Sequence, residues 1–469
     1  MLTFSPRSTG PFRRVVVLAA IAALTPMTGR AQPAAFTLRD ALAHAAGGAV
    51  PNRAARASSD AASAARIGAW RTILPTLRVD AGFVRTSDPV AAFGTALRHQ
   101  RITAADFDPA RLNFPAPSNN FTGALVIEQP VFMLDGWLAA RAGARASDGA
   151  HRSTAWTGLT TQVEVIDAWF GVILAAERAS TMTAATHAAQ AHVRQADAML
   201  EAGLVTKSDV LLAAARAGDL EVLRLDAARD SILARRRLTV LLGDGAPIVP
   251  ELLGSFPADT IVEHLARDVA SLESRPRADV QAAQAGAASA NANVERARAA
   301  LLPRVISFAR RDLNSADRPF GGSSNWSVGV MASWSLFSGA AELGDQRNAQ
   351  ARSAGAAAQL AGAMANANLD LERTSLSLQS ALARLAIART TAQQAEEAHR
   401  IVTRKYEGGL ATVVELLDAA VAETQSLLGL SAARHLLITS IAERLLSTGH
   451  EPARLAVLGD PATARSSTP

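Results

Sequence analysis

The sequence predicts a mainly α-helical fold with a small β part, in which two repeats of long helices carry four short transmembrane strands per chain. Three observations lead to this prediction. Landmarks of the first half return in the second half at an offset of 206 residues, since 409 − 203 = 206 for the two Gly-Leu pairs. Two stretches of roughly 68 residues are helical in composition, and four segments of about ten residues alternate between apolar and polar side chains.

The composition favours helices over a bulky globular core. The chain has 469 residues, 49% of them hydrophobic, but alanine dominates that fraction. Alanine is the best helix former and buries little apolar area. The chain contains no cysteine, which excludes disulfides, thiolate metal sites and a cysteine nucleophile. The net charge is only +5 and basic residues occur singly, so no nucleic acid is expected as a partner.

Residues 1–31 have the features of a secretory signal peptide. Three arginines precede the apolar run Val15–Leu24, and Gly29-Arg30-Ala31 offers small residues for cleavage. A membrane anchor is the alternative, but this run is too short to span about 30 Å of hydrocarbon. No later segment is apolar and uncharged over eighteen residues, so we expect the mature chain to enter a membrane only as β-structure.

The duplication divides the rest of the chain into a first repeat at 32–245, a linker at 246–261, a second repeat at 262–449 and a C-terminal tail at 450–469. Corresponding landmarks keep their order and nearly their spacing: Leu74-Pro75 with Leu302-Pro303, Pro130-Val131-Phe132 with Ser335-Leu336-Phe337, Gly203-Leu204 with Gly409-Leu410, and Gly243 with Gly449. Such pairs indicate one fold written twice rather than three separate domains.

Within each repeat the elements follow one order. A helix of about 24 residues ends at Leu-Pro, because proline disfavours helix in the residue before it. Two short alternating segments follow, then a long helix, a Gly-Leu turn and a helix of about 37 residues. The long helices are expected at about Met133–Leu200 and Ser338–Lys405, each roughly 100 Å long. We expect each to pack against the two shorter helices of its repeat.

The alternating segments are expected as strands at about 76–86, 121–132, 304–313 and 326–337. The clearest places Trp326, Val328 and Val330 on one face, whereas the third segment has only Ile306 and Phe308 on one side. Period-two alternation over about ten residues matches a transmembrane strand with a lipid face and a wet face. A soluble hairpin, which shows the same pattern, is the alternative.

Four strands per chain cannot close a barrel. Unpaired strand edges are not tolerated in lipid, and the smallest closed transmembrane barrels have about eight strands. If the strands lie in a membrane, several chains must pool them, so we expect an oligomer.

Across nearly the whole mature chain, the sequence resembles the TolC-type outer-membrane efflux protein family. The resemblance is carried by the segment Phe36–Leu42, the two Leu-Pro helix ends, the strand exits Pro130–Phe132 and Ser335–Phe337, and both Gly-Leu turns. It implies a homotrimer with a twelve-stranded β-barrel in the outer membrane, continued by a coiled-coil α-barrel across the periplasm. It also implies an equatorial collar formed by Asp244–Leu272 and the tail after His450.

The resemblance implies the channel component of a tripartite efflux system, or of type I secretion, that exports small molecules from the periplasm or from an inner-membrane pump. The implied partners are a periplasmic adaptor (membrane fusion) protein, an inner-membrane RND- or ABC-type pump, and outer-membrane lipid. A channel needs no catalytic centre, so no catalytic residue, cofactor or metal is expected.

Glu415 and Asp418 are candidate residues of a periplasmic gate. They follow the second Gly-Leu turn at a spacing of i, i+3 and therefore share a helix face. By the resemblance they match acidic positions around a constricted entrance, where three copies would favour cations. The alternative is that two acids at the start of a helix complement its dipole and face solvent.

Tyr406, the only tyrosine, and Asp209 complete the candidate gate. By the resemblance, Tyr406 matches a position whose polar links hold the closed state, and Asp209 matches the acidic partner in the first repeat. A basic residue that some family members carry is Ala411 here, so that link is absent unless Lys207 substitutes for it. The alternative role of Tyr406 is packing.

Gly203-Leu204 and Gly409-Leu410 are the candidate docking tips. Glycine lets the chain reverse tightly, and the leucine beside it offers an apolar knob. By the resemblance these tips meet the hairpin of a periplasmic adaptor, whereas elsewhere such a pair is only a helix C-cap with its hydrophobic contact. The segment Phe93–Pro117, between the first two strands, is expected to be a long external loop.

Two other classes of function compete with a channel. An enzyme is not supported, because the sequence has no His-Glu-x-x-His pair, phosphate loop, Gly-x-Ser-x-Gly elbow or dinucleotide fingerprint. The alternative is a periplasmic coiled-coil adaptor, an interaction protein of an export system. An adaptor would share the signal peptide and the long helices, but it should have one hairpin flanked by lipoyl-like β modules, without duplication.

Overall fold

The computed structural model describes residues 36–243 and 255–459, so the predicted signal peptide at 1–31 lies outside the described residues. The helices are α1 (Leu38–Gly48), α2 (Val50–Ala69), α3 (Pro89–Arg98), α4 (Pro109–Asn113), α5 (Leu134–Glu201), α6 (Lys207–Leu242), α7 (Asp259–Ala270), α8 (Ala278–Ala299), α9 (Ala341–Glu407) and α10 (Val413–Ser447), with the 3₁₀ helices η1 (Trp70–Thr72), η2 (Ala104–Phe107) and η3 (Pro452–Gly459). The strands are β1 (Thr76–Thr86), β2 (Ser118–Phe132), β3 (Arg304–Ser315) and β4 (Ser323–Ser333).

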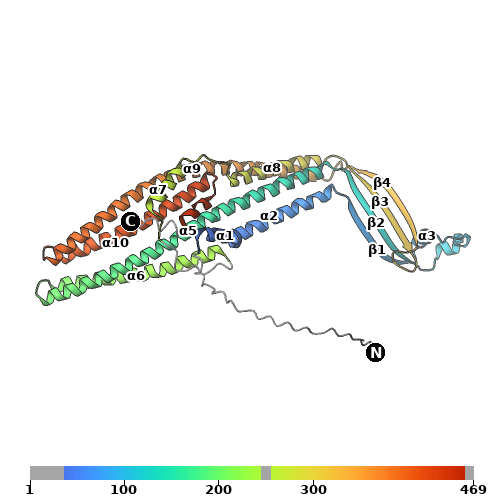
Figure 1. Ribbon diagram of the computed structural model, residues 1–469. Helices are drawn as coiled ribbons and strands as arrows, with labels where there is room; N and C mark the ends of the chain where they lie inside the picture. The colour runs from blue at the N-terminus through green and yellow to red at the C-terminus, as the bar shows by residue number, and fades with distance from the viewer. Residues whose placement is uncertain (1–35, 244–254, 460–469) are drawn as a thin grey trace, which may run out of the picture. The chain divides into compact units, whose positions relative to one another are not determined.

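The order of elements repeats along the chain (Figure 1). The first half runs α2, β1, β2, α5, α6, and the second half runs α8, β3, β4, α9, α10. Helices α1 and α7 precede the corresponding helices α2 and α8, and η3 follows α10. The prediction of a mainly helical chain with a small antiparallel sheet is confirmed.

The two long helices are nearly equal in length, with 68 residues in α5 and 67 in α9. Helix α9 starts at Ala341, slightly later than the expected Ser338, because Gly339 and Ala340 have φ values of 65° and 66°. Two consecutive residues in the left-handed region cannot belong to an α-helix, so the helix begins after them.

Each long helix packs against two shorter ones, as expected. Helix α5 contacts α2 and α6, while α9 contacts α8 and α10. Contacts of α5 with α8 and with α10 join the two repeats. The two helical hairpins, α5 with α6 and α9 with α10, lie side by side and are joined mainly through α5 and α10 (Figure 1).

The main hydrophobic core lies around the middle of α5 and α9, where shorter elements converge on them. Its buried side chains include Phe170 of α5, Leu385 of α9 and Ile441 of α10. Helix α1, the end of α6, helix α7 and η3 also contribute, and Leu455 of η3 is fully buried. We call this region the collar. It consists of α1, α7 and η3 with the parts of α5, α6, α9 and α10 that pack against them.

Helix α7 begins at Asp259, inside the range 246–261 that the sequence suggested as a linker. The Asp259 carboxylate lies 3.1 Å from a guanidinium nitrogen of Arg389 and 2.8 Å from one of Arg434, which belong to α9 and α10. Glu263, one turn later, lies 2.7 Å from Arg389. These ion pairs anchor the first turn of α7, and an acid there also complements the helix dipole. The predicted linker therefore includes the start of α7, while its residues 246–254 lie outside the described residues.

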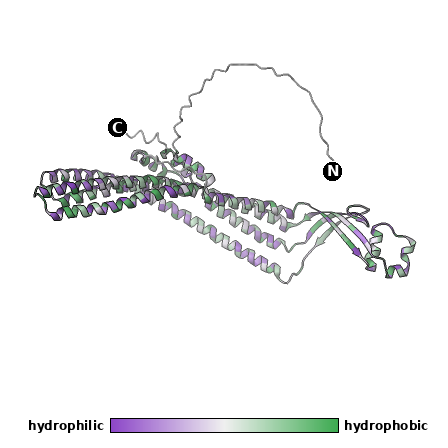
Figure 2. Cartoon of the chain, turned by 90° about the horizontal axis from the view of Figure 1, so that it is seen from below, coloured by the Kyte–Doolittle hydropathy of each residue, from purple (hydrophilic) through white to green (hydrophobic). Residues whose placement is uncertain are grey.

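One helix of the described residues could cross a membrane by length and composition alone, which the sequence analysis did not expect. Helix α5 contains an 18-residue window with a mean hydropathy of 1.3. However, 44% of that window is buried inside the chain, and α5 supplies Val165, Trp169 and Phe170 to the collar core. A core helix meets the same criterion. Hydrophilic and hydrophobic residues are interspersed along the helices as a whole (Figure 2).

The strands form one antiparallel sheet in the order β1-β2-β3-β4. Its register aligns Leu77, Ile127, Ala309 and Val328 in a row across the four strands. Side chains aligned in this way share a face, and alternate residues of each strand continue it. This face is predominantly apolar and exposed, with Arg85 of β1 and Arg311 of β3 as its charged exceptions.

The opposite face of the sheet carries charged pairs. Arg78 lies 3.1 Å from Asp80 on β1, and Arg310 lies 2.8 Å from Asp312 on β3. A charged group on a lipid-facing strand surface costs several kcal/mol at mid-depth, about 2–4 for arginine or lysine. The sheet therefore has one face suited to lipid and one suited to water.

Ile306 and Phe308 lie on the charged face, so they do not extend the apolar surface formed by the other three strands. Phe308 aligns with Gly329 of β4, where an added Cβ would lie only 2.8 Å from the phenyl ring. The ring therefore covers the glycine across the strand pair. The weak alternation of β3 reflects this local packing.

Strand β4 ends at Ser333, earlier than the expected position 337. Ser333 aligns with Arg304, the first residue of β3, and the preceding Pro303 has no amide hydrogen to continue the ladder. Trp334 then donates its indole N–H to Leu301 O at 2.9 Å. Strand β2 begins before, and β3 ends after, the residues expected for them.

The segment between β1 and β2 contains α3, η2 and α4, where the sequence suggested only a long external loop at Phe93–Pro117. His99 attaches it to the sheet: its Nε2 lies 3.0 Å from Asn120 Oδ1, and its carbonyl accepts a hydrogen bond from Ser323 Oγ at 2.9 Å. Asn120 in turn donates to Asn314 Oδ1 at 3.0 Å. This chain of polar contacts joins the segment to β2, β3 and β4.

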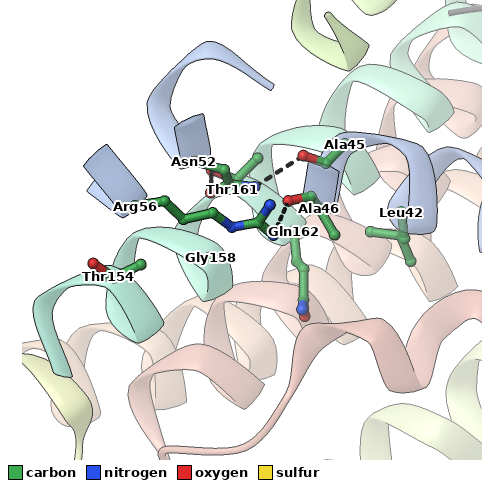
Figure 3. Close-up of a pocket in the computed structure, with 9 residues that line it drawn as sticks. All are labelled: Leu42, Ala45, Ala46, Asn52, Arg56, Thr154, Gly158, Thr161 and Gln162. Carbon is green, nitrogen blue, oxygen red and sulfur yellow. Dashed lines mark hydrogen bonds between the residues drawn. The ribbon is translucent and has the colours of Figure 1, made fainter. Parts of the chain in front are cut away.

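A cavity of about 140 Å³ marks the joint between α1 and α2 (Figure 3). The last carbonyls of a helix lack partners within it. Here Asn52 Nδ2 donates to Ala45 O at 2.9 Å, and Arg56 Nη2 donates to Ala46 O at 2.6 Å. Thr161 Oγ1 of α5 donates to Asn52 Oδ1 at 3.1 Å. These polar groups are therefore used to fasten the joint to α5.

Replacing Asn52 with alanine should destabilise the collar modestly, because Ala45 O and the Thr161 hydroxyl would each lose one hydrogen bond and keep only those to the Ala49 amide and to Thr157 O. A hydrogen bond contributes about 0.5–1.5 kcal/mol net to stability. The measurement is the thermal unfolding midpoint of the purified protein in detergent, followed by circular dichroism. Ser58→Ala, at an exposed position of the same helix, is the matched control. Equal midpoints for the two variants would contradict this role of Asn52.

Candidate functional site

The two Gly-Leu turns, which connect α5 to α6 and α9 to α10, are built alike. Gly203 and Gly409 have φ values of 72° and 75°, a region that side-chain-bearing residues rarely adopt. In each turn the leucine N–H donates to a carbonyl in the last turn of the preceding helix, at 2.8 Å for Leu204 and 2.7 Å for Leu410. This is the hydrogen bond of a Schellman motif.

Both turn leucines project into solvent. Leu204 is 70% exposed and Leu410 is 82% exposed. A leucine that only completed a helix C-cap would contact the end of its own helix and be largely covered. The exposure therefore weighs against the C-cap as the full explanation and leaves an apolar knob at each turn.

Each turn is followed by a capping box that the sequence analysis missed. Thr206 and Thr412 are the N-caps of α6 and α10, and Asp209 and Glu415 are the acids three residues later. Asp209 accepts from the Thr206 amide at 2.9 Å and hydroxyl at 2.7 Å, and Glu415 accepts from those of Thr412 at 2.7 and 3.2 Å. The signal was a Thr-x-x-acid pattern shortly after each Gly-Leu pair.

The capping boxes keep these two carboxylates ionised. The pKa of Asp209 lies below its ordinary value because first the Thr206 hydroxyl and then the Thr206 amide donate to it. The pKa of Glu415 is lowered first by the Thr412 amide and then by its hydroxyl. Since both pKa values are lowered by folding, the caps contribute stability above the ordinary pKa and lose it as the pH falls through the lowered one.

Asp418 lies one turn after Glu415, and both side chains are exposed. Leu416 and Leu417, between them, are buried. The two acids therefore share the outward face of α10, as their spacing indicated. The cap explains the position of Glu415, whereas Asp418 has no hydrogen bond or ion pair with another described residue.

Tyr406 lies in a small hydrophobic cluster beside the turns. It is 2% exposed and packs with Ala213 of α6 and with Val413 and Leu417 of α10. Its hydroxyl has no hydrogen-bond partner among the described residues. Burial, and then the negative charge of Asp209, raise the pKa of Tyr406. Within one chain Tyr406 thus packs the two helical hairpins together without a polar link to Asp209.

A serine–histidine pair elsewhere in the fold is close enough to resemble the nucleophile and general base of a hydrolase. Ser59 Oγ of α2 lies 2.8 Å from His151 Nδ1 of α5, but Ser63 Oγ lies 3.2 Å from the other ring nitrogen, and Ser59 is buried. Both nitrogens therefore join α2 to α5. Within residues 36–243 and 255–459, no group of three or more His, Asp or Glu side chains could hold a metal ion.

The model of the outer membrane efflux protein family matches residues 53–244 and 270–445. Among solved structures, a membrane protein from Pseudomonas aeruginosa is similar, with 18% identity over 88% of this chain and 93% of that chain and a TM-score of 0.74. The CmeC outer membrane channel of Campylobacter jejuni has 16% identity over 91% of this chain and 89% of that chain, with a TM-score of 0.73. The outer membrane protein VceC of Vibrio cholerae has 21% identity over 88% of this chain and 96% of that chain, with a TM-score of 0.73.

No protein with a curated description matches the sequence. The solved structures, at these low identities, establish the fold, and the family match covers most of the chain. The match confirms the resemblance to TolC-type proteins and identifies a family of transport proteins rather than enzymes. The chain belongs to the outer membrane efflux protein family, and it is an efflux protein of the outer membrane.

Proposed function

We propose that three copies of this chain form the outer-membrane channel of a tripartite export system, which carries small molecules from the periplasm or an inner-membrane pump to the outside. The observation that carries the proposal is the open sheet with one apolar and one charged face. Twelve strands from three chains would close a barrel with the apolar face toward lipid and the charged face toward a water-filled lumen.

The outer strands of the sheet support this assembly. Strands β1 and β4 each pair on one side only within the chain, which leaves a row of backbone groups on the other side. Hydrocarbon offers those groups no hydrogen bonds, so each β1 edge needs the β4 edge of a neighbouring chain. CmeC and OprN, which share the fold, are both described as outer membrane channels.

Helices α6 and α9 support the same contact. Each exposes one apolar stripe, formed by Leu211, Val222, Leu233 and Val240 on α6 and by Leu369, Leu376, Ile387 and Ile401 on α9. The steps of 7, 11 and 14 residues are close to whole numbers of helical turns. Since α6 and α9 contact each other little within the chain apart from the cluster around Tyr406, α6 of one chain can meet α9 of the next, a head-to-tail contact that closes a ring.

At the far end of the helices, we assign Glu415 and Asp418 to an acidic ring around the periplasmic entrance. Both are exposed acids on one face of α10 beside the second turn, and the capping box lowers the pKa of Glu415. Three copies in a narrow mouth would attract cations and repel anions. Asp209 holds the start of α6, and Tyr406 packs the hairpins together behind the ring.

The turns themselves are proposed as the docking surface for a periplasmic adaptor protein. Gly203 and Gly409 give each turn its shape, and Leu204 and Leu410 are exposed at it. An exposed leucine at the end of a long helical hairpin suits an apolar contact with another helical tip. Two hairpins per chain, with the family match, favour the channel over the adaptor as the function of this chain.

The double variant Glu415→Gln/Asp418→Asn should reduce the preference for cations about twofold or more, because it removes the ring charges. Glutamine can still accept the Thr412 hydrogen bonds, so the cap is kept. The measurement is the reversal potential in planar bilayers under a KCl gradient, on protein shown to be trimeric by native mass spectrometry. Thr412→Val, which keeps the charges and removes the cap hydroxyl, should leave the reversal potential unchanged. An unaltered reversal potential in the double variant would contradict the proposed acidic ring. A wild-type protein that is monomeric and does not conduct would contradict the proposed channel.

Leu204→Glu or Leu410→Glu should lower export about tenfold or more while the trimer still assembles, because a charge would be buried at the adaptor contact. Export is measured as dye accumulation in cells that lack their own channel and carry the matched adaptor and pump. Val50→Glu, at an exposed apolar position at the start of α2, is the control and should export normally. Normal export by both turn variants would rule out docking at the turns.

A further inference from the structure

Two histidines meet across the interface between the helical hairpins. His192 belongs to α5 of the first hairpin, and His399 belongs to α9 of the second. Their ring centroids are 6.3 Å apart, with the rings at 77° to each other. Both lie within a few turns of the Gly-Leu turns, in the part of the hairpins that forms the proposed gate.

His399 is held by a carboxylate. Its Nδ1 is hydrogen-bonded to Glu423 Oε2 of α10, and the two side chains are only 19% and 24% exposed. Since a carboxylate can only accept, Nδ1 is the donor. The other ring nitrogen, Nε2, is buried and has no hydrogen-bond partner among the described residues. A proton added to Nε2 would therefore be a buried N–H without an acceptor.

His192 is in an environment that disfavours its charged form. It is half-buried, and the pKa of His192 is lowered first by burial and then by the charge of His399, with a small opposing effect from Gln195. In this packed arrangement His192 therefore takes up a proton less readily than it would with its ring in water.

Among the described residues that line this place, no acid is free to compensate a second positive charge. Both histidines line a groove of about 640 Å³ between the hairpins, together with Arg178 of α5 and the pair Arg216 and Asp219 of α6. Asp219 lies 3.8 Å from Arg216, and Glu423 is bonded to His399. Arg178 adds a further positive charge. Protonation of both rings would place like charges against each other within the interface.

We propose that His192 and His399 form a proton-responsive latch, which holds the two hairpins of a chain together at neutral pH and releases them in acid. The consequence for gating rests on the proposed channel function. The ordinary pKa of histidine is about 6.5, and the pKa of His192 in the packed form lies below it. Above a pH of about 6.5 both forms are unprotonated and the packed form dominates. As the pH falls below it, the proton binds the separated form more readily and shifts the equilibrium toward release.

The test uses the full trimer in planar bilayers, recorded from about pH 7.5 to about pH 5.5. On acidification over this range, we expect the ratio of open to closed channels to rise. The rise should be about tenfold for each unit by which the pKa of His192 differs between the packed and the separated hairpins. His192→Gln and His399→Gln should lose this rise, because glutamine does not protonate and can still donate to Glu423 from position 399. His187→Gln, on an exposed face of the same helix α5, should keep it.

A second measurement does not depend on conduction. Hydrogen exchange of residues 193–209 and 394–416 in the wild-type trimer should become faster in acid relative to collar segments, and this change should be absent in His192→Gln. If the double variant His192→Gln/His399→Gln and the wild type show the same pH dependence in both measurements, the latch is ruled out. A trimer that conducts at no pH would overturn the channel proposal, while the exchange data would still decide the latch.

Discussion

The unpaired edges of the four-stranded sheet are the constraint on which the rest of the molecule depends. Backbone groups in hydrocarbon need partners, so β1 and β4 cannot stay as they are in a single chain. The exposed stripes of α6 and α9 need partners for a different reason, because there the surroundings are water. In the proposed trimer, one head-to-tail contact between neighbouring chains would meet both needs and would tie the strands and the helices to the same assembly.

Local patterns in the sequence were enough to predict the elements, and contacts between distant residues decided what the patterns missed. Alanine-rich stretches ending at Gly-Leu turns located α5 and α9 closely. The start of α7 was missed because Asp259 is anchored by Arg389 and Arg434, which are far along the chain. The end of β4 depends on Pro303 in the neighbouring strand, and no pattern within β4 could show it.

The candidate site shows the same division. The shared face of Glu415 and Asp418 follows from helical spacing, and the structure places both there. The capping boxes were visible in the sequence as Thr-x-x-acid patterns and were overlooked, because the acids had already been given a role. For Tyr406 the sequence left a polar link and packing as alternatives, and it could not decide between them because the burial depends on Ala213 of the other hairpin.

The two turns satisfy their own backbone groups, through the Schellman hydrogen bond on one side and the capping box on the other. None of these bonds uses the side chain of Leu204 or Leu410. The identity of the residue at the apex is therefore uncoupled from the folding of the hairpin that bears it. If the turns dock an adaptor as proposed, such a position can change with the surface of that partner while the fold of the hairpin is kept.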